Sequence, residues 1–464
     1  MESTTNRIFD LYIKLGGIIL EITLKDIKDF SKEYNSNPTN KIIENAITTN
    51  GLENACLDRD IVRENQPVFN IELPDTKRYD QKESWKCWIY AGFNMIQYNM
   101  AENLNMDLMD FELSSNYIAF FDKLEKANTI YENIISLPIE NTTLEYIKQE
   151  RLLKDCVTEA GFYEWFASII KKYGIIPYSY MPNPKEGEDG DKISRIFREK
   201  VKKDVICLLE EKKQGKSEEE LRNLTKTYAK QNYIFLSKIL GEPPMTFDLE
   251  YKDKNGTYIS QKRITPMDFK NQYLTLNLDD FVSIANMPMY NKEYNKIYRL
   301  KHFGNVYKNS YRQFLNLPIE DLKRCAIEQL KDGIPVCVTL EIESKSVYEK
   351  QGILDTRVYN YKNTLNMQSL NKREGLDFSE IHLSHCMTIT GANVISNHIQ
   401  RWKVEDSYGV GPDEKPNGYY TMNDNYFDKF VMDVIINKRY LTEEQRELLN
   451  QEPIEYDIDM DDEI

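Results

Sequence analysis

Apolar residues in the first half of the chain recur at the spacing of α-helices. Between residues 24 and 50 they repeat every three or four positions on both sides of a turn at 35–39, which predicts two helices in an N-terminal arm. From Cys87 to Met100 the chain is apolar on nearly every side, as expected of a helix buried inside a domain. Further helices are predicted at 108–128, 162–173, 193–211 and 217–240.

The segment from 193 to 240 differs from the other helical stretches in its charge. Lys and Glu residues are dense there at separations of four positions, and Gly215 interrupts the pattern. Pairs of opposite charge at this spacing stabilise helices whose faces are solvated. The pattern therefore predicts a solvent-exposed helical hairpin that projects from the core.

The period of the pattern changes to two after residue 330. Val336, Val338 and Leu340 alternate with other residues, which is typical of a strand. A helical first half is thus followed by an antiparallel second half, and this order indicates an α+β fold. The chain then returns to a short helix near residue 443 and continues as an acidic tail at 452–464. The other predicted strands are Cys386–Thr390, Arg401–Glu405, Tyr419–Met422 and Phe430–Ile436.

Composition excludes several classes of protein. With 41% hydrophobic residues among 464, the chain can bury a substantial core in two or three folding units of roughly 150 residues each. No apolar stretch reaches the roughly 20 residues of a membrane-spanning helix, because charged residues and glycines interrupt the longest one, 11–24. The net charge of -15 disfavours nucleic acid as the main partner. We therefore expect a cytoplasmic protein with no membrane partner.

One cysteine stands in a position that favours chemistry. The seven cysteines are scattered without a CxxC pair, so most of them are expected to be reduced thiols in the core. Cys87, however, begins the buried apolar helix, where unpaired backbone N–H groups and the helix dipole lower the pKa of a thiol. The same N–H groups can stabilise an oxyanion, and Gln81, six residues earlier, can supply an amide donor. A core cysteine is the alternative interpretation of Cys87 taken alone.

Two further residues could assist a cysteine nucleophile. His385 enters a predicted strand, and Asp406 follows the next strand 21 residues later, where a carboxylate can orient an imidazole on a neighbouring strand. His382 and His385 form an HxxH pair, but no convincing third ligand lies nearby, so neither a metal nor another cofactor is expected. A structural histidine and an aspartate in a surface turn are the alternatives for each residue taken alone.

A cysteine that opens a helix, followed by a histidine and an acid or amide on later strands, resembles the papain-like cysteine peptidases. More narrowly, the chain from about residue 22 onward resembles the bleomycin hydrolase and aminopeptidase C family in the order and spacing of its motifs. The motifs that carry the resemblance are Asn37–Lys41, Gln81–Ala91, Phe111–Ser114, Asp122–Asn128, Lys172–Pro177, Leu240–Pro244, Gly304–Val306, Gln329–Pro335, Gly352–Asp355 and Gln451–Ile454.

The resemblance implies a two-lobed papain-like fold and a catalytic role for each candidate residue. Cys87 would be the nucleophile, His385 the general base and acid, and Asp406 the partner that orients the histidine. Gln81 would be an oxyanion-hole donor beside the Cys87 backbone N–H. The implied reaction is amide hydrolysis through a thioester, which needs no cofactor.

The resemblance also implies how peptides are selected. Relatives form barrel-like homohexamers whose active sites face an internal chamber, and their C-terminal arm places its terminal carboxylate against the free amino group of the substrate. The substrate-binding residues would be Trp85, Trp88, Gly161 and Ile464. The expected parts of the chain are an arm at 1–66, a helical lobe at 67–192, an inserted oligomerisation hairpin at 193–245, a β lobe at 246–440 and a C-terminal helix with an acidic arm at 441–464.

Several departures from the family cluster at the expected site. The family has Asn in place of Asp406, and a carboxylate there should raise the pKa of His385. Tyr408 replaces a Trp, Trp85 replaces a Gly, and residues 159–162 replace an Asp-Gly-Gly-Gln run. A cysteine aminopeptidase is the function that the resemblance implies. The alternative is a catalytically impaired relative that acts as an oligomeric peptide-binding or scaffold protein.

Overall fold

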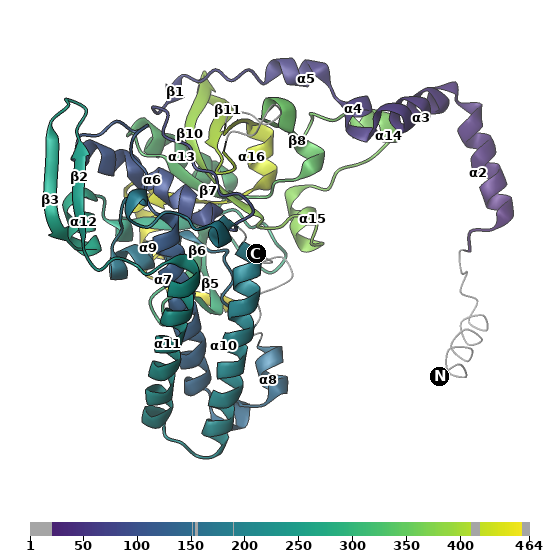
Figure 1. Cartoon of the computed structure of the whole chain (residues 1–464). Coiled ribbons are helices and arrows are strands. Elements are labelled where there is room, and N and C mark those ends of the chain that lie inside the picture. The colour runs from purple at the N-terminus through teal and green to yellow at the C-terminus, as the bar shows by residue number, and fades with distance from the viewer. Residues whose placement is uncertain (1–20, 151, 154–155, 189, 410–417, 457–464) are drawn as a thin grey trace, which may run out of the picture. The chain divides into compact units, whose positions relative to one another are not determined.

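The computed structural model describes residues 21–150, 152–153, 156–188, 190–409 and 418–456 (Figure 1). The chain divides into two compact units. The smaller unit consists of Met1–Asp58 and Tyr359–Gln368, and the larger of Arg59–Val358 and Ser369–Ile464. Cys87, His385 and Asp406 all belong to the larger unit.

The smaller unit confirms the two predicted helices and the turn between them. Helices α2 (Leu24–Ser36) and α3 (Pro38–Asn50) meet at Asn37, whose side chain accepts a hydrogen bond from the Thr39 N–H while Pro38 occupies the first turn of α3. The unit also contains α4 (Leu52–Cys56) and α14 (Tyr361–Leu365), which are linked by a contact of 3.3 Å between Cys56 Sγ and Thr364 Oγ1.

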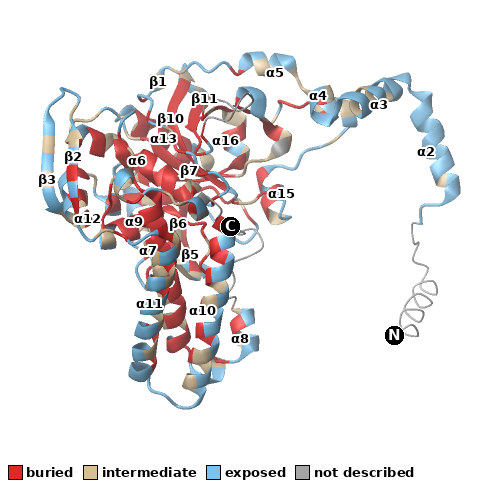
Figure 2. Ribbon diagram, viewed as in Figure 1, coloured by how far each residue is buried: buried red, intermediate tan, exposed pale blue. Residues whose placement is uncertain are grey.

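Helices of the larger unit pack around α6 (Cys87–Leu104), which is buried along almost its whole length as predicted (Figure 2). The side chains of Phe93, Ile96 and Met100 have no exposed surface. No helix in the described ranges is both long and apolar enough to span a membrane. The other helices of this unit are α5 (Arg59–Glu64), α7 (Ser115–Ser136), α8 (Leu144–Gln149), α9 (Tyr163–Tyr173), α10 (Gly190–Lys213), α11 (Glu218–Leu240), α12 (Pro266–Tyr273), α13 (Ile319–Lys331), α15 (Lys372–Asp377), α16 (Asp424–Phe430) and α17 (Glu443–Leu448).

Helix α7 begins seven residues later than the predicted start at 108. Ser114 caps the helix, because its side chain accepts a hydrogen bond of 3.1 Å from the Tyr117 N–H. Leu113 forms an isolated β-bridge with Pro177, so the chain before Ser114 is extended rather than helical. The cap and the bridge together correct the predicted boundary.

Helices α10 and α11 form the predicted hairpin, and one face of it is less solvated than the charge pattern indicated. Both helices pack along α7 (Figure 1). Phe197, Val201 and Val205 of α10 are fully buried, whereas the opposite face is exposed (Figure 2). The hairpin and α7 thus share a strip of the main core.

Most strands of the second half of the chain form one large sheet, which with the helices of the first half makes an α+β fold. Within the described residues the strands follow the order β14-β5-β6-β4-β13-β7-β10-β11-β12-β9-β8, and β1 pairs with β10. The predicted wholly antiparallel arrangement is wrong at three places, because β4 pairs with β6, β9 with β12 and β5 with β14 in parallel. The strands are β1 (Ile71–Glu72), β4 (Phe281–Ala285), β5 (Lys296–Gly304), β6 (Tyr311–Asn316), β7 (Val336–Leu340), β8 (Val347–Tyr348), β9 (Ile353–Leu354), β10 (His385–Ile395), β11 (His398–Glu405), β12 (Tyr419–Asn423), β13 (Val431–Asn437) and β14 (Ile454–Tyr456), with a separate hairpin of β2 (Phe247–Lys252) and β3 (Tyr258–Ile264).

Candidate active site

The first candidate residue, Cys87, opens α6 immediately after the N-cap residue Lys86. Its side chain is half-buried, and all seven cysteines of the chain are free thiols. Strand β10 packs on α6, and Thr388 Oγ1 donates a hydrogen bond of 3.3 Å to the carbonyl oxygen of Ala91, one turn beyond Cys87. This packing brings the start of α6 to the start of β10.

His385 and Asp406 lie on adjacent antiparallel strands and contact each other directly. His385 is the first residue of β10, and Asp406 follows the last residue of β11. The His385 Nε2 atom lies 2.7 Å from Asp406 Oδ1, and both side chains are buried. Asp406 Oδ1 also accepts a hydrogen bond of 2.8 Å from the Ser407 N–H, which fixes the carboxylate in place. The pairing is the geometry expected of an oriented imidazole.

Cys87 and His385 perturb each other electrostatically. The interaction with the Cys386 thiol has the largest effect on the pKa of Cys87, and the interaction with the His385 imidazole adds to it. Together they hold the pKa of Cys87 well below its ordinary value, although burial opposes this shift. Burial alone would lower the pKa of His385, but the Asp406 carboxylate and Cys87 outweigh this effect and raise it to about 10. The two shifts favour a thiolate beside an imidazolium at neutral pH.

Tyr408 covers one face of the imidazole. The ring centroids of Tyr408 and His385 lie 5.4 Å apart with an angle of 26° between the ring planes. The Tyr408 side chain is 41% exposed, so it stands between His385 and solvent. The Tyr408 ring thus shields one face of the His385 imidazole.

Gln81 is held rigidly beside the strand that carries Asp406. Its backbone N–H donates to the Ser407 carbonyl at 2.7 Å, and its side-chain oxygen accepts a hydrogen bond of 2.5 Å from Ser407 Oγ. The side-chain amide nitrogen donates to the Ser84 carbonyl at 2.8 Å, which uses one of its two hydrogens. The buried amide therefore has a defined orientation before any substrate binds.

The expected substrate-binding residues have different surroundings. Trp85 is 47% exposed, whereas Trp88 is buried and donates from its ring nitrogen to the Glu159 carbonyl at 2.8 Å. Gly161 lies against Trp88 so closely that a Cβ at this position would be 2.6 Å from the indole. Ile464 and the acidic end of the tail lie outside the described residues.

A buried charge cluster beside Cys87 was not predicted from the sequence. The Glu159 carboxylate lies 3.6 Å from Lys123 Nζ and 3.9 Å from Lys86 Nζ, and it accepts a hydrogen bond of 3.3 Å from the Trp85 N–H. These ion-pair side chains are almost completely buried. Burial would raise the pKa of Glu159, but Lys123 and Lys86 reverse that effect and lower it. The cluster links the segment that precedes Cys87 to Lys123 of α7.

Cys386 is a second residue that sequence reasoning missed. Its buried thiol lies 3.8 Å from Thr339 Oγ1 on β7, and it interacts with the Cys87 thiol, whose pKa it lowers. This contact and burial raise the pKa of Cys386 well above its ordinary value. Its position next to His385 in the sequence was the available signal. Among the described residues, no group of three or more His, Cys, Asp or Glu side chains is arranged to hold a metal ion.

Comparisons with known proteins agree over nearly the whole chain. The sequence profile described as "Peptidase C1-like family" matches residues 21–460. Aminopeptidase C of Listeria monocytogenes serovar 1/2a is 32% identical over 437 residues, which cover 94% of this chain and 96% of the relative. Aminopeptidase G of Lactobacillus delbrueckii subsp. lactis is 33% identical over 436 residues, with coverages of 94% and 98%. The crystal structure of PepW from Lactobacillus rhamnosis superposes with a TM-score of 0.88 at 31% identity, covering 94% of this chain and 97% of that one.

Proposed function

This chain belongs to the Peptidase C1-like family, and we propose that Cys87, His385 and Asp406 are the catalytic groups of its cysteine aminopeptidase activity. The observation that carries the assignment is the contact of 2.7 Å between His385 and Asp406, and it is supported by the opposite pKa shifts that Cys87 and His385 impose on each other. Acyl transfer to a cysteine uses a thiolate beside an imidazolium, which is in turn oriented by a carboxylate. The alternative role, an inactive scaffold, is not favoured by relatives named as aminopeptidases.

The first half of the reaction forms a thioester on Cys87. The Cys87 thiolate attacks the carbonyl carbon of the first peptide bond and produces a tetrahedral oxyanion. In this proposal the Cys87 backbone N–H at the start of α6 and the remaining hydrogen of the Gln81 side-chain amide would donate to that oxygen. Because His385 Nε2 is held by Asp406, the Nδ1 atom is left to protonate the leaving amine.

The second half of the reaction releases the acid. Once the thiolate has become a thioester, its negative charge no longer stabilises the imidazolium, so the pKa of His385 falls. The neutral imidazole then accepts a proton from water, which attacks the thioester and regenerates Cys87. Asp406 opposes this step by holding a proton on His385, which is the expected cost of a carboxylate in place of an amide.

The proposal also covers how the free amino terminus of a peptide is recognised and how the subunits assemble. Trp85, Trp88 and Gly161 would form the substrate side of the cleft, and Ile464 would pair with the free amino group of the peptide. We propose peptides as substrates, a homohexamer as the assembly and the cytoplasm as the location. The surface segment 193–245 would then contribute to contacts between subunits.

Alanine substitution of the nucleophile tests the catalytic assignment. We expect Cys87→Ala to abolish hydrolysis of aminoacyl fluorogenic substrates, whereas Cys207→Ala, which alters another half-buried thiol, should retain it. An N-acetylated version of the same substrate should resist the wild-type protein, because the free amino group is required. Titration with an epoxide that alkylates thiols should consume one equivalent per chain at Cys87. Full turnover by Cys87→Ala would refute the assignment, and absence of epoxide capture would favour the scaffold.

A further inference from the structure

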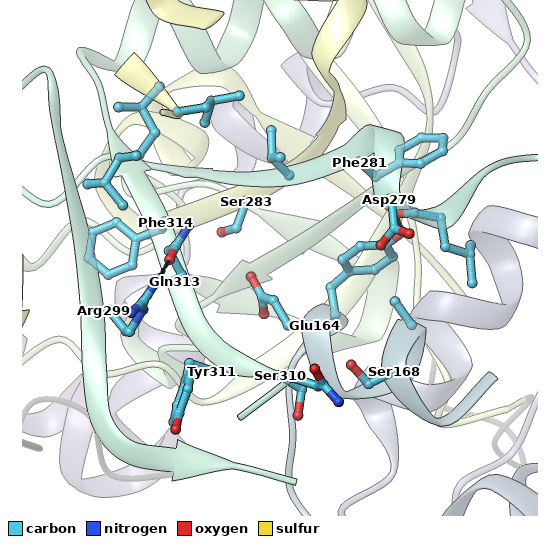
Figure 3. Close-up of a pocket in the computed structure, with 18 of the residues that line it drawn as sticks. Glu164, Ser168, Asp279, Phe281, Ser283, Arg299, Ser310, Tyr311, Gln313 and Phe314 are labelled. Atoms are coloured by element: carbon cyan, nitrogen blue, oxygen red, sulfur yellow. Dashed lines mark hydrogen bonds between the residues drawn. The ribbon is translucent and has the colours of Figure 1, made fainter. Parts of the chain in front are cut away.

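A cavity of about 310 Å³ lies between α9 and the sheet (Figure 3). The parallel strands β4 and β6 pair only at Ile284 with Leu315 and at Ala285 with Asn316. The residues that precede these pairs on both strands line the cavity, and α9 closes its other side. The cavity is therefore a product of the short parallel ladder, and none of Cys87, His385 and Asp406 lines it.

Glu164 of α9 points into this cavity with an unsatisfied carboxylate oxygen. Figure 3 shows the carboxylate near the centre of the lining residues. One oxygen lies 3.4 Å from a guanidinium nitrogen of Arg312. The other, Oε2, is buried and has no hydrogen-bond partner among the described residues. Burial raises the pKa of Glu164 to about 7, although Arg312 opposes the shift.

Arg312 donates one long hydrogen bond of 3.4 Å to Glu164 Oε1 and leaves Oε2 without a donor, because its guanidinium is shared with other partners. Its guanidinium pairs with the buried Asp433 carboxylate and donates a hydrogen bond of 2.9 Å to Ser283 Oγ. Buried polar groups are nearly always hydrogen-bonded, so an oxygen such as Glu164 Oε2 indicates a donor supplied by a ligand or by water.

The remaining lining of the cavity combines apolar side chains with the basic side chains of Arg299 and Lys308 and with Lys171 and Asp279, which form an ion pair with each other. Arg299 is fixed by two hydrogen bonds of 3.2 and 3.0 Å to Gln313 Oε1, and Lys308 lies in the neighbouring loop. The apolar lining residues are Leu278, Phe281, Ile297, Phe314 and Leu449. The cavity thus places a carboxylate, a hydrocarbon wall and basic side chains around one small volume.

We propose that this cavity binds a free amino acid with an apolar side chain, whose ammonium group donates to Glu164 and whose carboxylate faces Arg299 and Lys308. An ammonium group has three donors and so supplies the hydrogen bond that Glu164 Oε2 lacks. A phosphate would face the Glu164 carboxylate and is disfavoured. The volume is at the lower end of the range for ligand pockets, roughly 300–1,000 Å³, which fits an amino acid and not a long peptide. The proposal does not rest on catalysis by Cys87, although the ligand has the chemistry of the expected product.

Calorimetric titration of the full-length protein with L-leucine tests the site. We expect saturable binding to one site per chain that persists after Cys87 has been alkylated by an epoxide, so that binding in the catalytic cleft is blocked. Glu164→Gln, which keeps the size of the side chain, should weaken binding about 10- to 100-fold, because a hydrogen bond to a charged group is lost. The matched control Glu140→Gln, at an exposed position, should bind like the wild type.

Ligand analogues and a second variant keep the test decisive if Glu164→Gln folds poorly. 3-Methylbutylamine lacks the carboxylate and 4-methylpentanoate lacks the ammonium group, so both should bind more weakly than leucine. Arg299→Gln should weaken the binding of leucine and leave the affinity for 3-methylbutylamine unchanged. The proposal is overturned if leucine does not bind saturably, if folded Glu164→Gln binds it with wild-type affinity, or if epoxide treatment alone abolishes binding. Loss of peptidase activity in Cys87→Ala would bear only on the proposed function.

Discussion

Replacing Asp406 by Asn tests the electrostatics of the active site most directly. The Asp406 carboxylate is buried 2.7 Å from the His385 ring, and it is the main reason that the pKa of His385 rises to about 10 against burial. Asn keeps a hydrogen-bond acceptor but removes the charge. Loss of an adjacent opposite charge lowers a pKa by about 1–3 units, and each unit corresponds to about 1.4 kcal/mol. We therefore expect the imidazolium in Asp406→Asn to lose about 1.4–4 kcal/mol of stabilisation.

The pH dependence of kcat/KM measures this change. The descending limb on the alkaline side reports loss of the imidazolium, so it should move to lower pH by about 1–3 units in Asp406→Asn. Asp110→Asn, at an exposed position, is the control and should leave the limb in place. Because the folded pKa of His385 is raised, its contribution to folding stability is complete below about pH 6.5 and is lost as the pH rises through about 10. Superimposable alkaline limbs for Asp406→Asn and the wild type would refute this account of the site.

Three further substitutions test the surroundings of Cys87. Glu159→Gln should lower the free energy of unfolding in urea by about 3 kcal/mol, because it removes the carboxylate that compensates the buried charges of Lys86 and Lys123; a change below about 1 kcal/mol would contradict this. Gly161→Ala should lower stability by about 1–3 kcal/mol in thermal unfolding, since its Cβ would overlap the Trp88 ring, and an unchanged Tm would show that the ring can move. Cys386→Ala should shift the pH dependence of iodoacetamide alkylation of Cys87 to higher pH, because a hydrogen bond that stabilises the thiolate is lost. The same alkylation profile in Cys386→Ala as in the control Cys325→Ala would exclude that role.

Local patterns in the sequence were sufficient to predict the helix and the strands that carry the candidate site. The all-round apolar stretch that begins at Cys87 is confirmed as α6, and the alternation after residue 330 is confirmed as strands β7, β10, β11 and β12. These patterns succeed because helix and strand periods are properties of neighbouring residues. The order of the motifs together with the resemblance was enough to select His385 and Asp406, which the structure places 2.7 Å apart, whereas the catalytic roles of Cys87, His385 and Asp406 stay predictions.

Tertiary structure alone decided the features that depend on residues distant in sequence. The start of α7 is set by a bridge between Leu113 and Pro177, which no local period encodes. Glu159 and Lys86 are separated by 73 positions in the sequence. They become partners because the folded chain brings the two segments into contact, as the hydrogen bond from the Trp88 ring to the Glu159 carbonyl shows. The cavity around Glu164 exists because β4 and β6 pair in parallel over two residues, a register set by packing against β13 and β5. Sequence patterns determine which elements form, whereas buried charges and cavities follow from how those elements pack.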